Sequence, residues 1–147
     1  MIRRGRRERA QSLVEFALIL PILLLIFMGI LDFGRAIYAY NSVSNAAREG
    51  ARLGIVDQRQ TAGIYNAATE AANQATALGL DPSNPAQVLV TFPDVDPSHN
   101  CSVISAGCPI SVRVQYQFTP ITPIIGRVFG PFTVGSTTEL PVERVQP

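Results

Sequence analysis

Residues that carry acid–base or metal chemistry are few in this chain and gather only once. His99 is the single histidine and follows Asp94 and Asp96 in one short stretch. A histidine beside two carboxylates can transfer protons or hold a metal ion, but Pro97 and Asn100 are typical of turns. No G-x-S-x-G, H-E-x-x-H or glycine-rich phosphate motif occurs. We therefore expect a turn, with no catalytic residue, metal or cofactor; a small exported hydrolase that uses this loop is an alternative.

Glu15 is a second residue with a specific chemical requirement, because it lies two residues inside an apolar stretch from Leu13 to Leu31. A carboxylate in lipid costs several kcal/mol unless it is paired or reaches the interface. Cleavage between Ala10 and Gln11 would create an α-amino group four residues before Glu15, one helical turn away. We expect that amine, or the amine of a neighbouring subunit, to neutralise Glu15. Snorkelling of Glu15 to the interface is the alternative.

The apolar stretch itself predicts a membrane-spanning helix. At about 1.5 Å per residue, Leu13–Leu31 is roughly 28 Å long, close to the ~30 Å hydrocarbon core of a bilayer. Pro21 predicts a kink near residues 17–21. The alternative is a secretory signal peptide, whose apolar region has about 7–15 residues and ends at a small-x-small site. This run is longer, and no such site follows it.

Charge indicates the orientation of this helix. Five arginines lie among the first nine residues, whereas Asp32 and Arg35 nearly cancel after the apolar run. The positive-inside rule then places the N-terminus in the cytoplasm and the rest of the chain outside it. A basic arm that binds nucleic acid is the alternative. The net charge is only +1, and after Ala10 ten acidic residues outnumber seven arginines, which argues against nucleic acid as a partner.

Cys101 and Cys108 are the two cysteines, and they enclose six residues. The expected orientation puts them outside the cytoplasm, where disulfides persist. Closing so short a loop would stabilise the fold by about 2–3 kcal/mol. We expect a structural disulfide; free thiols are the alternative, and a zinc site would need further ligands.

The order of these features resembles a known family. A basic leader, a small residue, and a hydrophobic helix with Glu15 fifth after the junction resemble the N-termini of type IV pilins and pseudopilins. More specifically, AQSLVEFALILPILLLIFMGILDFGR at 10–35 and NAAREGAR at 45–52 resemble the TadE/TadG-like proteins of the tight-adherence (Flp) pilus system. The resemblance continues as GCPISVRVQYQFTPITPIIG at 107–126. Ala10 departs from the pattern, since the prepilin peptidase family usually prefers Gly there.

The resemblance implies a function without catalysis. The chain would be a membrane-anchored pseudopilin or minor pilin that acts in assembly of a Flp-type pilus, in the inner membrane with its C-terminal domain extracytoplasmic. Implied partners are the lipid bilayer, the major pilin, other minor pilins, the inner-membrane assembly platform and a prepilin peptidase. Ala10, Gln11 and Glu15 would be the processing and assembly residues. The alternative is a single-pass, membrane-anchored extracytoplasmic binding protein without a pilus role.

The expected fold is α+β and type IV pilin-like, with a basic cytoplasmic leader (1–10), a transmembrane helix (11–35) and an extracytoplasmic head (36–147). The helix is expected to continue outside the membrane, because one face is marked by residues at helical spacing: Phe33, Ile37, Tyr40, Ser44, Ala47, Ala51 and Gly54. The small residues at the end of this face would pack against the protein's own sheet or against neighbouring subunits.

The head is expected to hold a second helix and a three-stranded antiparallel sheet. Asp57-x-x-Gln60 resembles a capping box that would start the second helix, and Gly79 would end it. Alternating apolar and polar residues predict strands at 87–92, 109–119 and 132–145. We expect the apolar connector at 120–131 to cover the end of the sheet; contact with the membrane surface or a partner is the alternative.

Overall fold

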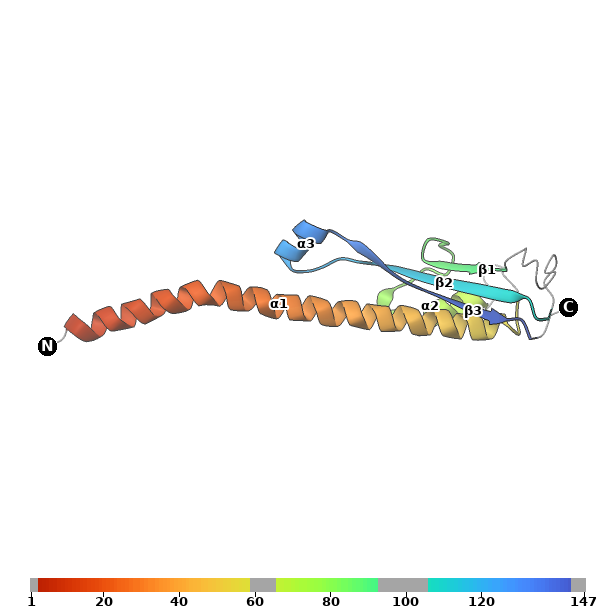
Figure 1. Ribbon diagram of the computed structural model, residues 1–147, viewed down its shortest axis with the longest axis horizontal. Helices are drawn as coiled ribbons and strands as arrows, with labels where there is room; N and C mark the ends of the chain where they lie inside the picture. The colour runs from red at the N-terminus through yellow and green to blue at the C-terminus, as the bar shows by residue number, and fades with distance from the viewer. Residues whose placement is uncertain (1–2, 59–65, 93–105, 144–147) are drawn as a thin grey trace. The chain divides into compact units, whose positions relative to one another are not determined.

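The computed structural model describes residues 3–58, 66–92 and 106–143. In chain order its elements are α1 (Arg3–Gly54), α2 (Ala67–Gln74), a 3₁₀ turn η1 (Thr76–Leu78), β1 (Val88–Thr91), β2 (Pro109–Phe118), α3 (Pro123–Phe129) and β3 (Phe132–Pro141) (Figure 1). This confirms the expected α+β class: a long N-terminal apolar helix, a second helix and a three-stranded antiparallel sheet. The predicted strands at 87–92, 109–119 and 132–145 are each slightly shorter in the structure.

The chain divides into two compact units. The first consists of Met1–Arg35 and Thr119–Pro131, and the second consists of Ala36–Phe118 and Phe132–Pro147. Helix α1 belongs to both units, because it continues from Arg3 to Gly54. The predicted division into leader, membrane helix and head stays a prediction.

In the first unit, α1 presents its apolar side chains to the surroundings. The large apolar side chains between Phe16 and Phe27 are exposed by 40% or more, except for Leu20, which is half-buried. The helix is long and apolar enough to cross a membrane. It continues unbroken through Pro21, and its red-to-orange part curves in Figure 1.

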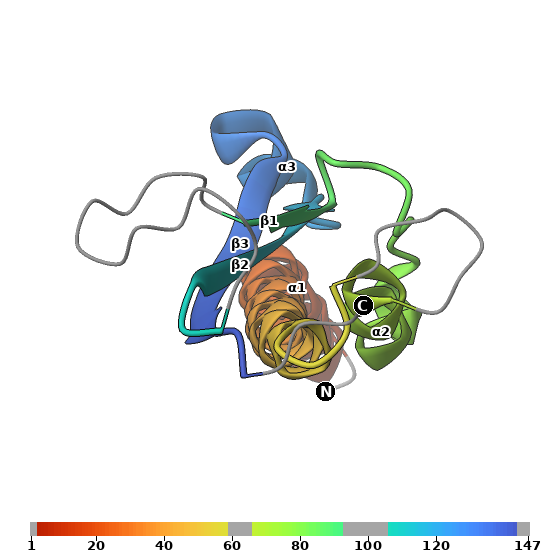
Figure 2. The same ribbon diagram turned by 90° about the vertical axis from the view of Figure 1, so that its right-hand side faces the viewer.

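In the second unit, a sheet of order β1-β2-β3 packs against the C-terminal part of α1. Both strand pairs are antiparallel, with Val112 of β2 opposite Val90 of β1 and Thr138 of β3. Figure 2 shows the yellow end of α1 between this sheet and α2. The core consists of residues from all of these elements: Val43, Ala46, Ala47, Ala51, Ala68, Ala71, Ala72, Ala75, Leu80, Val88, Ile110, Val112, Val114 and Val142.

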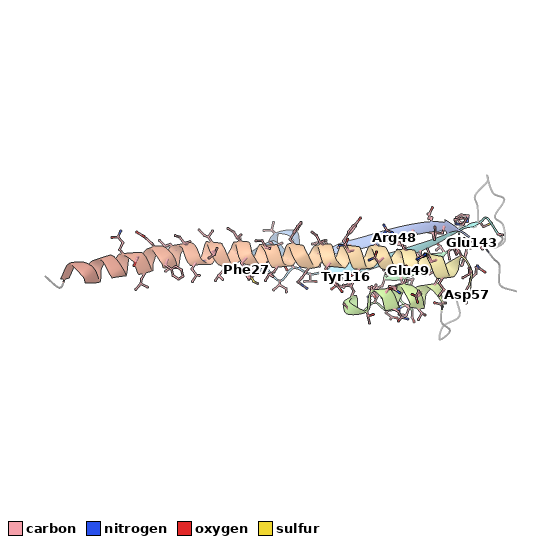
Figure 3. All side chains as sticks on the ribbon, turned by 90° about the horizontal axis from the view of Figure 1, so that it is seen from below. Phe27, Arg48, Glu49, Asp57, Tyr116 and Glu143 are labelled. Carbon is pink, nitrogen blue, oxygen red and sulfur yellow. The ribbon has the colours of Figure 1, made fainter. Side chains whose placement is uncertain are left out.

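The small residues of α1 let α2 and the sheet come close to its backbone. A Cβ added at Gly50 would lie 2.8 Å from the carbonyl oxygen of Ala67 and 2.9 Å from Cβ of Ala71. A Cβ at Gly54 would overlap Cδ1 of Ile110. The small-residue face is therefore buried within the head itself, as expected. Arg48 and Glu49, labelled in Figure 3, lie off this face, and Glu49 pairs with Arg52 at 3.1 Å.

Burial along the predicted helix face is confined to the small residues at its end, because Phe33, Ile37 and Tyr40 at its start are all exposed. The buried positions before the small-residue face are Ala39 and Val43. A strict alternation of four- and three-residue steps drifts by about 20° per heptad on a straight α-helix. Over the three heptads from Phe33 to Gly54, the predicted line therefore turns away from the buried face by roughly 60°.

The predicted start of a helix at Asp57-x-x-Gln60 stays a prediction, because residues 59–65 lie outside the described residues. Asp57 follows the end of α1, and its N–H donates to the carbonyl of Leu53 at 2.9 Å. Helix α2 begins after Asn66, whose side-chain oxygen accepts the N–H of Thr69 at 3.0 Å. Asn66 is a good cap in itself, and starting there places Ala67 and the following alanines in the core. Gly79 ends η1 with φ 62, as predicted for a stop residue.

The close packing at Gly50 predicts that Gly50→Ala destabilises the head by about 1–3 kcal/mol, because backbone atoms of α2 must move. In a domain this small, each kcal/mol lowers the melting temperature by about 4–8 °C. Gly34→Ala is the matched control, because nothing lies within 4 Å of its added Cβ. Thermal unfolding of both full-length variants in detergent tests this. A Gly50→Ala variant that melts with the wild type would contradict the packing described.

Candidate functional site

The predicted assembly residues lie on an exposed part of α1. Ala10, Gln11 and Glu15 are all exposed, and Nε2 of Gln11 donates to Oε1 of Glu15 at 3.2 Å. The structure thus brings residue 11 and Glu15 together across one helical turn. The donor is the neutral amide of the Gln11 side chain, which orients the carboxylate without neutralising it. Cleavage after Ala10 and pairing of Glu15 with an amine stay predictions.

The other predicted residues contribute little to a site in the described part of the chain. Cys108 is buried directly before β2, whereas Cys101 lies outside the described residues, so the disulfide stays a prediction. Asp94, Asp96 and His99 also lie outside the described residues. Their interpretation as a turn is therefore not tested.

A different carboxylate, Asp32, makes long-range polar contacts within the first unit. It is the first residue after the apolar run and is only 4% exposed. Its Oδ1 accepts the N–H of Ile121 at 2.9 Å, and its Oδ2 accepts the N–H of Thr122 at 2.8 Å. Both oxygens thus bind the main chain of a segment about ninety residues later in the sequence.

Arg35 completes the surroundings of this buried carboxylate. Its Nη1 lies 3.2 Å from Oδ1 of Asp32, one turn further along α1. The guanidinium is partly exposed, whereas the carboxylate side chain is 5% exposed. Hydrogen bonds to an ionised acceptor are stronger than neutral ones, and a buried charge needs such partners. The Asp32 carboxylate therefore binds the main chain of another segment of the protein.

Asp32 holds the start of α3 against α1. Thr122 is the N-cap residue of α3 and Pro123 its first residue, and the N–H of Gly126 donates to the carbonyl of Thr122 at 2.8 Å. A Cβ added at Gly29 would lie 3.8 Å from Cδ1 of Ile125. The connector was expected to cover the end of the sheet; it contacts α1 at residues 29–32.

Sequence reasoning used Asp32 and Arg35 only as charges that balance each other. Two sequence signals indicated a structural role for Asp32 and a helix start at Thr122. Asp32 is a single carboxylate directly at the end of an apolar run, and Thr122-Pro123 is typical of a helix start. Neither signal identifies the other residue as its partner.

The comparisons with known proteins concern α1. A helix able to cross a membrane, followed in the chain by an α+β head, defines a candidate single-pass membrane protein. The family model described as TadE-like protein matches residues 10–52. This match agrees with the resemblance of residues 10–35 and 45–52 to the TadE/TadG-like family. No curated protein and no solved structure matches the chain.

The contact at Asp32 predicts that Asp32→Ala releases the segment that contains α3. We expect hydrogen exchange at the amides of Ile121 and Thr122 to become faster by roughly tenfold or more, because both lose a charged acceptor. The amides of Val112 and Val114, within the β2 ladders, should be unchanged. Exchange of the full chain in detergent, followed by mass spectrometry or NMR, measures this.

Glu49→Ala is the matched control, because it removes an exposed carboxylate of the same helix whose partner is Arg52. Equal exchange at Ile121 and Thr122 in the wild type and in Asp32→Ala would show that Asp32 does not hold the segment.

Proposed function

We propose that this protein is a membrane-anchored pseudopilin or minor pilin that acts, without catalysis, in the assembly of a Flp-type pilus. The observation that carries the proposal is the TadE-like match over residues 10–52. This match contains both the exposed apolar surface of α1 and Glu15 near its start. The alternative, a membrane-anchored extracytoplasmic binding protein without a pilus role, has no comparable support among the described residues.

The topology in this proposal follows from charge. The five arginines before Ala10 would stay in the cytoplasm, residues 11–35 would cross the inner membrane, and residues 36–147 would lie outside. The apolar side chains that are exposed between Phe16 and Leu31 would contact lipid. The head would then be the part available to other exported proteins.

Assembly contacts would follow the length of α1. In the membrane, Glu15 would pair with an amine, either the α-amino group of a chain cut before Gln11 or that of a neighbour. Beyond the apolar run, Phe33, Ile37 and Tyr40 are exposed on α1 and would contact the helices of adjacent subunits. The partners would be the major pilin, other minor pilins and the inner-membrane platform, with a prepilin peptidase if the leader is cut.

This proposal predicts that Glu15→Ala leaves the protein in the membrane but abolishes its assembly role. Glu15→Gln should fail equally, because it keeps a hydrogen-bonding partner for Gln11 but removes the charge. Glu49→Ala should behave as the wild type. The measurements are membrane fractionation and the amount of pilin in the sheared surface fraction of complemented cells.

The same samples give the N-terminal residue of the protein recovered from the membrane, which is Gln11 if the leader is cut. Normal piliation by the Glu15→Gln variant would contradict the pairing of Glu15 with an amine. Normal piliation of cells that lack the protein entirely would contradict the pilus role.

A further inference from the structure

The segment Thr119–Pro131, called here the α3 segment, is fixed to α1 at one defined level. The contacts are the two hydrogen bonds from its main chain to Asp32 and the approach of Ile125 to Gly29. Leu31, the last residue of the apolar run, lies between these two contact points in the sequence. The α3 segment therefore lies at the end of the apolar run of α1, where Asp32 is the first charged residue.

The α3 segment exposes apolar side chains at this level. Ile121 is 58% exposed and Val128 is 69% exposed. In water, both side chains would leave apolar surface uncovered. Thr122, which belongs to the same segment, is in contrast buried, with 2% exposure. The segment is thus anchored on one side and uncovered on the other.

Basic side chains accompany these apolar ones. Arg127 is exposed beside Val128, and Arg35 is partly exposed next to Asp32. Within Thr119–Pro131 the sequence contains no acidic residue. Apolar side chains next to arginines are the combination by which segments lie in the interface of a bilayer, with the arginines near lipid phosphates.

We propose that the α3 segment is a second membrane contact, which lies in the interfacial layer of the bilayer on the side where α1 leaves it. Ile121 and Val128 enter this layer, and Arg35 and Arg127 bind lipid phosphate groups. Asp32 is the positioning residue, since it holds the segment at the level of the last apolar turn of α1. The inference rests on the proposed crossing of the membrane by α1.

Lipid is the partner that best fits this surface. The α3 segment contacts α1 at residues 29–32, the end of the run of α1 that would face lipid. A span of about sixteen to nineteen apolar residues, roughly 24–28 Å long, barely matches the hydrocarbon thickness. A second contact at its outer end would fix the depth of α1 in the bilayer. A helix held at two points also resists sliding along its axis.

The chain contains no tryptophan, so one introduced tryptophan reports on its own surroundings. The test uses the full-length Val128→Trp variant in vesicles of phosphatidylcholine and phosphatidylglycerol, with acyl chains brominated close to the headgroup. Leu24→Trp, in the apolar run, is the control for lipid contact. Ala77→Trp, exposed in η1 of the head, is the control for water contact.

The expected result is a blue-shifted emission of Trp at position 128 that shallow bromines quench more than deep bromines do. Emission that resembles the Ala77→Trp control, while Leu24→Trp is quenched, overturns the inference and leaves the membrane span intact. Loss of quenching at both positions overturns the span itself, and the inference with it. A blue shift without quenching that grows with the protein-to-lipid ratio indicates a second copy on this surface and overturns lipid contact.

The role of Asp32 is tested in the same vesicles. Adding Asp32→Ala to Val128→Trp should reduce quenching by the shallow bromines, whereas adding Glu49→Ala should not. Unchanged quenching after Asp32→Ala contradicts the positioning role of Asp32.

Discussion

The exposed apolar surface of α1 is the constraint on which the rest of the structure depends. From Phe16 to Leu31 there is no charged or hydrogen-bonding side chain, and the apolar side chains of this run are largely exposed. Burying one large apolar side chain is worth about 1.5–3 kcal/mol. Exposing this whole surface to water is therefore strongly unfavourable. A bilayer satisfies it, because a helix pairs its own backbone groups and needs no other partner in lipid.

The C-terminal part of the same helix is packed within the protein. Beyond Arg35, α1 is one layer of a packed core, and most of its buried residues are small. Gly50 and Gly54 let α2 and Ile110 approach the helix backbone, while Val43 and the inward side chains of β2 fill the remaining space. An alanine-rich core gains little per residue, so close packing is essential to its stability. Asp32 directly follows the apolar run. Its carboxylate binds the main chain of the α3 segment.

The sequence was informative where a pattern is long and periodic. The apolar run predicted α1, and the alternation from Ile110 to Phe118 predicted β2 and its buried face. It was less informative about the start of α2, because Asn66 is one of several residues in this stretch that can cap a helix, and the burial of the alanines after it is a tertiary effect. The spacing from Phe33 to Gly54 did not show which part of this helix face is buried, because a seven-residue spacing drifts relative to a straight helix.

The contact between Asp32 and the α3 segment was not predictable from local patterns. Its donors are main-chain N–H groups, which every residue except proline carries, so no side-chain type marks Ile121 as the partner of Asp32. The roles predicted for Glu15 and Ala10 depend on other molecules, a neighbouring subunit and a peptidase. The cysteine pairing depends on Cys101, which lies outside the described residues.

Protease added to intact spheroplasts of cells that produce the full chain tests the central claim most directly. With α1 across the membrane and the arginines inside, the protease should remove the head and leave a membrane-bound N-terminal fragment. A head that is cut only after the membrane is broken, or a full chain recovered in the soluble fraction, would contradict the account.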